Sequence, residues 1–229
     1  MRTFRHTGLT THLLVILLNP WWWIIIQRNF LAGLLVFSLS LVLYLYFWQI
    51  ESRVLLILLV IFTLILFFLS VRAAFDESIF RNSALDIQQY NKRHEFYSND
   101  LGKLYKNRFI LTYFKDYNFP ISKIQRNFFN NLDPNLYFFA SHPRERLGIE
   151  EFQKYLPIFL PLFLIGMFHF IFAPVTKILI YLISVFLLSS IISPKYNLGP
   201  VLIFPFINLM ITIGIILSWK KVLRYFLKK

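Results

Sequence analysis

Long apolar runs separated by short polar breaks dominate both ends of the chain. Because backbone amides in hydrocarbon must be paired within their own segment, an apolar run of about 20 residues predicts a helix that spans a bilayer. Five runs reach or approach this length: Phe30 to Gln49, Val54 to Val71, Pro157 to Phe172, Ile178 to Ile192 and Val201 to Trp219. The pattern therefore predicts five clear transmembrane helices.

Breaks within and between these runs predict how the helices are joined. The only polar residues between the first two runs are Glu51, Ser52 and Arg53, a short turn that predicts a tight helical hairpin. Pro161 and Pro205 lie inside the third and fifth runs. A proline in a helix interior removes a donor and clashes with the preceding turn, so both positions predict broken helices.

A different pattern holds between residues 72 and 155, where charged, amide and aromatic side chains alternate without a spanning run. Ala73 to His94 lacks glycine and proline, which predicts a helical continuation of the second span. Tyr97 to Leu111 predicts a second helix with Asp100 in its first turn, and Pro120 and Asp133-Pro134 predict breaks. We expect a mostly helical extramembrane domain.

The segment Leu13 to Ile26 is too short for a straight span and contains Asn19-Pro20. Its three adjacent tryptophans favour the headgroup boundary, so an interfacial or re-entrant helix and a short sixth span both remain open. Bulky residues follow where a signal-peptide cleavage site would need small ones, so we expect the segment to be retained.

These patterns predict an all-α fold: a polytopic transmembrane helical bundle with a mostly helical extramembrane domain inserted between the second and third clear spans. The chain begins with a basic tail and an interfacial or short membrane segment (1–29), followed by a transmembrane hairpin (30–71). The extramembrane domain (72–155) comes next, and three transmembrane helices (156–219) and a basic C-terminal tail (220–229) complete the division.

Composition supports the membrane interpretation. Hydrophobic residues make up 57% of the 229 residues and charged residues only 15%, which leaves more apolar surface than a soluble fold can bury. The net charge is +13, and its charges flank the apolar runs, so anionic lipid headgroups are the expected counter-charge. The chain has no cysteine, which excludes disulfides and thiol chemistry.

Basic flanks predict orientation. The tail that contains Lys220, Lys221 and Lys229 is expected to stay in the cytosol of a cell-membrane protein, which places residues 72–155 outside and, with six spans, Arg2 and Arg5 inside. The opposite orientation, with five spans and a cytosolic N-terminus, would require the basic tail to cross the membrane.

His169 is an ionisable side chain within the third apolar run and the first candidate site. Such residues are costly in lipid and are candidates for proton or ligand binding. The other runs supply no obvious partner, so the alternative is a histidine near the interface that bonds a backbone carbonyl or a headgroup.

A polar cluster before the third run is the second candidate site, and its members are His142, Arg144, Glu145 and Arg146. Paired arginines can clamp a phosphate, and a histidine can act as a general acid or base. An exposed helix start with internal ion pairs accounts for the same residues.

Other chemistry lacks sequence support. The five histidines are scattered, and no zinc-binding, nucleotide-binding or nucleophile motif occurs, so we expect no metal and no cofactor. Basic and aromatic residues mix from Lys92 to Arg126, but acidic residues offset the charge, so nucleic acid is not an expected partner.

Three functions fit these features. The first is a non-enzymatic scaffold, assembly factor or accessory subunit that docks a protein through residues 72–155. The second is a transporter or permease subunit with proline-broken helices. The third is a membrane-surface enzyme that acts on lipid-linked or phosphorylated substrates, so the sequence leaves open whether the chain is an enzyme.

Overall fold

The computed structural model is all-α over the residues that it describes, which are 2–48, 52–75, 78–80, 84–96, 109, 112–113, 117–139, 154–172, 176–194 and 198–226. The helices are α1 (Arg2–Leu17), α2 (Pro20–Arg28), α3 (Phe30–Trp48), α4 (Arg53–Ala73), α5 (Ala84–Phe96), α7 (Asn118–Leu132), α8 (Asn135–Phe138), α9 (Phe159–Phe172), α10 (Thr176–Ser189), the 3-10 turn η4 (Val201–Ile203) and α11 (Phe204–Phe226). This confirms the predicted fold class.

Three of these helices are long and apolar enough to cross a membrane: α3, α4 and the continuous stretch Val201–Lys221. A fourth span results if the bent pair Gly8–Leu17 and Pro20–Arg28 crosses as one unit. The third and fourth predicted spans correspond to α9 and α10, which have only 14 residues each. At 1.5 Å per residue, neither reaches across a core of about 30 Å without further chain.

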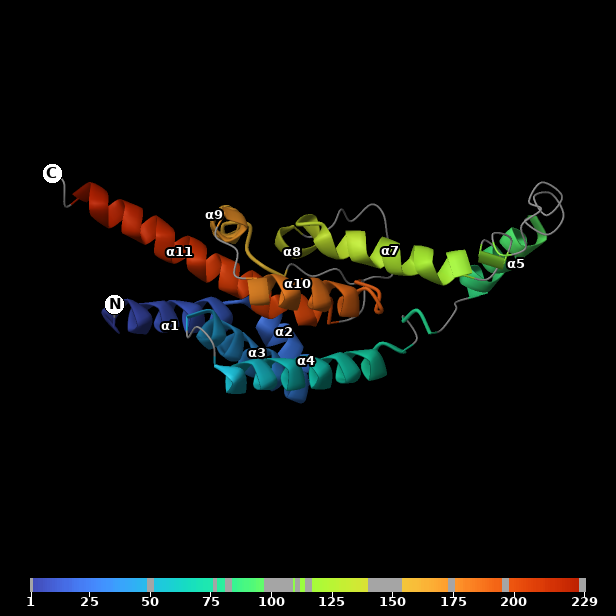
Figure 1. The fold of residues 1–229 in the computed structure, drawn as a ribbon, viewed down its shortest axis with the longest axis horizontal. Coiled ribbons are helices and arrows are strands. Elements are labelled where there is room, and N and C mark those ends of the chain that lie inside the picture. Colours follow the sequence, from blue (N-terminus) through green and yellow to red (C-terminus); the bar gives the residue numbers. More distant parts are fainter. Residues whose placement is uncertain are drawn as a thin grey trace.

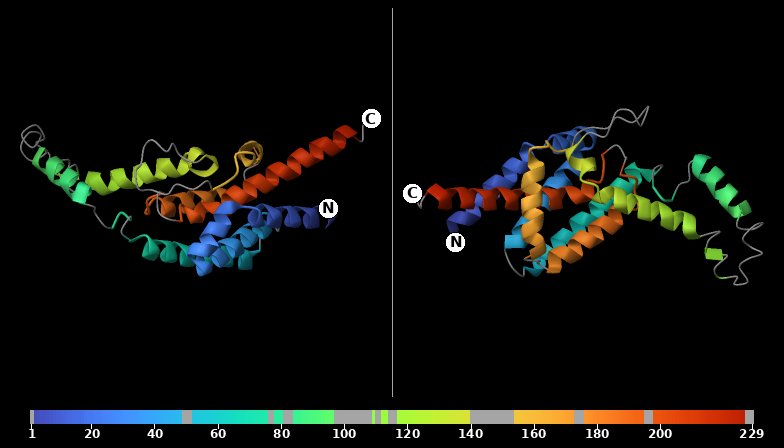
Figure 2. Two further views of the ribbon diagram at one scale, coloured as in Figure 1. Left: turned by 180° about the vertical axis from the view of Figure 1, so that it is seen from behind. Right: turned by 90° about the horizontal axis from the view of Figure 1, so that it is seen from above.

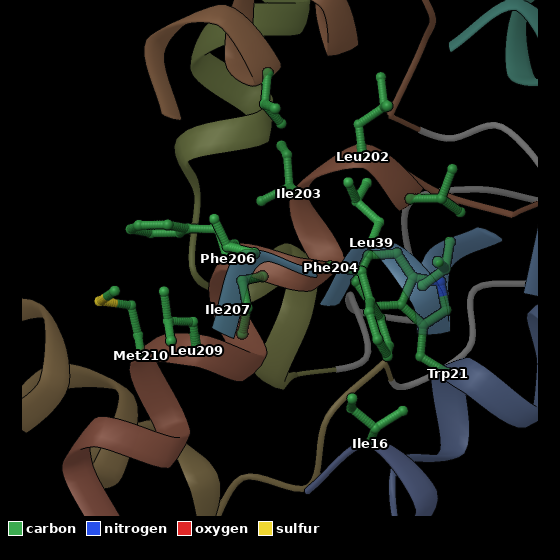
Figure 3. Packing of buried hydrophobic residues seen from close by; sticks show 14 of the residues in the cluster. Ile16, Trp21, Leu39, Leu202, Ile203, Phe204, Phe206, Ile207, Leu209 and Met210 are labelled. Carbon is green, nitrogen blue, oxygen red and sulfur yellow. The ribbon is translucent and has the colours of Figure 1, made fainter. Parts of the chain in front are cut away.

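The central helix of the bundle is α11. Within its most apolar stretch 78% of the residues are buried, compared with 22% for α4. The start of α11 packs against α2 and α3, where Trp21, Leu39 and Phe204 meet (Figure 3). The outer face of α4 exposes apolar side chains such as Ile57 and Phe68, as expected for a surface that contacts lipid.

Two glycines allow α9 and α11 to cross at close range. A Cβ atom added to Gly166 would collide with the backbone of Met210, and one added to Gly214 would collide with the backbone of Leu162. Each helix therefore supplies one glycine, and that glycine lies against the backbone of the other helix. Helices in membranes commonly use small residues in this way, because close backbone approach replaces the missing hydrophobic drive.

The two ends of the molecule differ. Figure 1 places both chain termini at one end and α5 with α7 at the other, and the views in Figure 2 agree. We call α5 and α7 the arm. Its attachment to the bundle includes Asn127, whose Nδ2 donates to the carbonyl of Ser190 at 3.0 Å, and ring contact between Phe128 and Phe186.

The predicted helix breaks at Pro161 and Pro205 are wrong. Pro161 is the third residue of α9 and Pro205 the second residue of α11. The first-turn N–H groups of a helix have no intrahelical acceptor, so a proline there costs no hydrogen bond. The observed bend, 59°, lies at Asn19-Pro20, where the side chain of Asn19 accepts from the Trp21 amide at 2.8 Å and caps α2.

A continuous helix from Ala73 to His94 is also not observed. The helix α4 ends at Ala73, and the next helix begins at Ala84. Between them the amide of Ile79 donates to the carbonyl of Ile191 at 3.0 Å, and Ser78 forms an isolated bridge with Ile192. Pairing with the segment after α10 thus replaces the helical hydrogen bonds. Most of the second predicted helix, with Asp100, lies outside the described residues.

Other predicted boundaries are confirmed. Ser52 caps α4, because its side chain accepts from the Leu55 amide, and α7 ends at Asp133-Pro134. Pro120 lies in the first turn of α7, so it marks a helix start. Of the three tryptophans expected at the headgroup boundary, Trp21 and Trp22 are buried within the bundle and only Trp23 is exposed.

Candidate functional site

The structure describes only one of the two candidate sites that the sequence suggested. His169 lies in the last turn of α9 and is exposed. Together with Trp48 and Lys220 it lines a cavity between the ends of α3, α9 and α11. The cluster of His142, Arg144, Glu145 and Arg146 lies outside the described residues, so its role stays a prediction.

A histidine that is not among the sequence-predicted candidates lies in the centre of the bundle. His12 of α1 is fully buried. Its Nδ1 is 2.8 Å from the hydroxyl oxygen of Thr212 in α11, and its Nε2 is 3.1 Å from the carbonyl oxygen of Ser40 in α3. The ring stacks on Tyr44, with 4.8 Å between the centroids. One imidazole therefore links three apolar helices.

The hydrogen bonds of His12 define its protonation chemistry. The carbonyl of Ser40 only accepts, so Nε2 carries a proton. The hydroxyl of Thr212 has one proton and two neighbouring acceptors, the Asn208 carbonyl at 2.7 Å and, in a neutral ring, Nδ1. A neutral imidazole accepts a hydrogen bond from the Thr212 hydroxyl at Nδ1. An imidazolium instead donates from Nδ1 to the Thr212 oxygen, and the Thr212 hydroxyl then donates to the Asn208 carbonyl. The hydroxyl orientation and the charge of His12 are thereby coupled.

Polar contacts continue from Thr212 along α11. Asn208 lies one turn earlier and is fully buried. Its Oδ1 accepts from the hydroxyl of Tyr155 at 3.2 Å, while its Nδ2 has no hydrogen-bond partner among the described residues. We call His12, Thr212, Asn208 and Tyr155 the polar seam. An unsatisfied buried donor within it costs free energy, which makes it the natural place for a bound water or ligand.

Trp21 closes the seam at the end near the arm. Its Nε1 donates to the Leu198 carbonyl at 2.7 Å, and its ring meets Tyr155 edge-on at 5.8 Å. The ammonium of Lys154 lies 5.8 Å from the Trp21 ring centre and donates to the Leu136 carbonyl at 3.0 Å. This packing fixes α2, the start of α9 and the start of α11 relative to one another.

Two tyrosines outside the spans keep their protons over a wide pH range. Burial raises the pKa of Tyr137 well above its ordinary value of 10.0, and the negative charge of Asp133 raises it further. Burial also raises the pKa of Tyr155, with the nearby Tyr137 adding to the shift and a hydrogen bond with Asn19 opposing it. Both hydroxyls therefore act as hydrogen-bond donors, to Asn131 and Asn208 respectively.

Chemically, the seam can orient a dipole or hold a proton. The helices α1, α3 and α11 contain no carboxylate, so a charge on His12 would have only dipoles to stabilise it. Within the described ranges, no three histidine, aspartate or glutamate side chains come close enough to hold a metal ion. The hydroxyl of Thr212 lies next to the His12 imidazole, but both side chains are fully buried within the bundle.

Part of the seam has a sequence signal. Asn208 and Thr212 are four residues apart in an otherwise apolar run, so they share a helix face, and a buried stripe on the central helix follows from that spacing. His12 has no such signal, because α1 has too many polar residues at its start to be recognised as part of a span.

No family model, no curated protein and no solved structure matches the chain. The class of protein is therefore defined by the fold alone: an all-α chain with three, or with the bent pair four, helices that could cross a membrane.

Proposed function

We propose that the protein is a non-enzymatic membrane subunit, with a scaffolding, assembly or accessory role, that docks a partner protein through its arm. The observation that carries this proposal is the exposure of α5. Every side chain described on this helix is exposed except Tyr90, which is half-buried. A helix of 13 residues that buries almost nothing is marginal in water, because helices in proteins derive most of their stability from packing.

Within the part of the chain that the structure describes, contacts with the ring of Phe119 attach α5 to α7. The ring of Tyr90 meets Phe119 of α7 edge-on at 6.1 Å, and the guanidinium of Arg93 lies 5.8 Å from the same ring centre. Around this attachment, Ile87 is 49% exposed and Phe96 is 53% exposed. On α7, Phe129 and Leu132 are exposed as well. Apolar side chains gathered on a projecting element favour burial against another protein.

The hydrogen bonds within the bundle also favour a structural role. Hydrogen bonds of the polar seam join α1 to α3 and to α11, and join Tyr155 to α11. Interactions of this kind fix helix positions in lipid. The one hydroxyl and base of the seam that lie in contact, Thr212 and His12, are fully buried, so neither is exposed to a substrate.

Photo-crosslinking from α5 tests the proposal. A photoreactive residue placed at Ile87, Asn91 or His94, the face that contains Tyr90, should give one discrete protein adduct in native membranes. The opposite face, at Gln89 and Lys92, should give little, because a docked helix contacts its partner through one side. Position Ile57 on the lipid-facing side of α4 is the control. Adducts of equal yield around α5, or lipid adducts alone, contradict the proposal.

The compartment of the arm is part of the same proposal. We infer a cell-membrane location with a cytosolic C-terminus. Both termini lie at the end opposite the arm (Figure 1), which supports an outside location for the arm. Single cysteines at Ser98, Ser52 and Lys228 test this in a chain without native cysteine. Ser98 should react with an impermeant thiol reagent in intact cells, and protection of Ser98 until lysis would reverse the orientation.

A transport subunit is the second candidate, and the bend at Asn19-Pro20 favours it. Broken helices beside a buried polar site are a common feature of transporters, and here the bend lies near Tyr155 and Asn208. If the seam conducts protons, His12→Phe should abolish proton flux in vesicles, whereas Pro161→Ala should not, because Pro161 lies in a first turn. Absence of flux in the wild type removes this candidate.

A further inference from the structure

A cavity of about 300 Å³ lies between the ends of three helices. Phe47 and Trp48 are the last two residues of α3, His169 lies in the last turn of α9, and Lys220 lies near the C-terminal end of α11. The C-terminal end of α11 lies at the end of the molecule opposite the arm (Figure 1). Neither the polar seam nor the arm uses this cavity.

The cavity combines an apolar floor with basic side chains. Phe47, Ile213 and Leu217 line it with hydrocarbon, while the imidazole of His169 and the ammonium of Lys220 supply the polar part of its wall. The helices α3, α9 and α11 contain no aspartate or glutamate. These three helices therefore bring basic but no acidic side chains of their own to the cavity.

The position along the helices matches the boundary between hydrocarbon and headgroups. Trp48 ends α3, and Trp219 is exposed beside Lys220 and Lys221. Tryptophan and lysine at helix ends are typical of this boundary, where the lysine stem lies along apolar surface and its ammonium reaches the headgroup layer. A ligand in the cavity would thus have its polar end at headgroup depth and its apolar end in the bundle.

We propose that this cavity binds one anionic phospholipid, with its phosphate against Lys220 and His169 and the start of an acyl chain against Ile213 and Leu217. Basic pockets between transmembrane helices bind anionic headgroups in this manner. The apolar floor gives a free phosphate ion nothing to contact, and the charge of the wall favours an anionic lipid over a zwitterionic one.

Lipid retention by the purified full-length protein tests the site. The protein is placed in micelles that contain equal amounts of phosphatidylglycerol and phosphatidylcholine, and native mass spectrometry measures which lipid stays bound. The wild type should retain one phosphatidylglycerol. A charge near the membrane surface contributes about 1 kcal/mol, so Lys220→Ala should weaken retention about fivefold. The control is Lys221→Ala, since Lys221 is exposed and is not part of the cavity wall.

Two further arms separate a built site from general attraction. Leu217→Trp fills the floor but keeps both basic groups, so it should also reduce retention, and an unchanged thermal midpoint shows that the variant is folded. Soluble glycerol phosphate should not displace the lipid, because it lacks the acyl chain. Equal losses in Lys220→Ala and Lys221→Ala, equal retention of the two lipids, or full displacement by glycerol phosphate would each overturn the proposal.

Discussion

The helices α11 and α5 show two opposite ways of placing polar and apolar side chains. In α11 the polar residues Asn208 and Thr212 are buried and bonded to neighbouring parts of the bundle, whereas apolar side chains fill the space around them. In α5 almost every described side chain is exposed, including the apolar Ile87 and Phe96. The side chains of α11 pack mostly within this chain, whereas those of α5 leave apolar surface exposed.

This difference separates what stabilises the fold from what the fold presents to other molecules. Hydrogen bonds and close packing around α11 hold the helices of the bundle to one another. In the arm, Tyr90 of α5 packs on Phe119 of α7, and apolar side chains such as Ile87 and Phe129 are exposed. Mutations in the two regions should therefore affect different measurements: stability in the bundle, and association in the arm.

The largest effect is expected at the crossing of α9 and α11. Gly214→Ala and Gly166→Ala each place a Cβ atom against backbone of the opposite helix, and backbone moves only if the helices separate. Overpacking of this kind costs about 1–3 kcal/mol or more, and we expect the upper end. Thermal unfolding in detergent, followed by circular dichroism, should show a clearly lower midpoint for both variants.

The matched control is Ile165→Ala, next to Gly166 in sequence but 42% exposed on the outer side of α9. It should change stability by less than about 0.5 kcal/mol. If Ile165→Ala lowers the midpoint as much as Gly166→Ala, the close crossing is not what stabilises the bundle, and the contrast with the arm loses its basis.

The fold class can be predicted because spanning a membrane requires long apolar runs, and these runs locate α3, α4 and the apolar part of α11 to within a few residues. Local rules misplace the breaks, because the effect of a proline depends on its position in the helix. Pro161 and Pro205 lie in first turns, whereas Pro20 follows a capping asparagine at a bend. The end of α4 is followed by pairing with residues near Ile192, which no local pattern reveals.

The buried site is harder to predict than the spans. His12 acquires its role from Ser40 and Thr212, which are 28 and 200 positions away in the chain. Their convergence depends on how three helices pack, and a single sequence contains no direct record of that packing. The sequence places His169 correctly near the end of its helix, but its neighbours Trp48 and Lys220 in the cavity wall come from two other helices.

A smaller effect is expected at the junction of the arm and the bundle, where Tyr137 in α8 is buried. Its hydroxyl donates to the Asn131 carbonyl at 2.7 Å. In Tyr137→Phe this carbonyl loses its donor, which should lower the free energy of unfolding by about 1 kcal/mol. Denaturant unfolding in micelles at pH 8 measures the difference, and it tests whether the junction shares the order of the bundle.

The pH dependence of the same variant distinguishes burial from simple contact. Since the pKa of Tyr137 is raised in the folded state, its contribution is fully present below the unfolded pKa of about 10 and is lost as pH rises through the folded pKa. Above pH 10 the wild type should therefore lose up to about 1.4 kcal/mol per pH unit more than Tyr137→Phe, so their stabilities converge.

Tyr117→Phe, at an exposed position just before α7, should follow the wild type throughout. A constant gap between the wild type and Tyr137→Phe from pH 8 to pH 11 would mean that the junction admits water and resembles the arm.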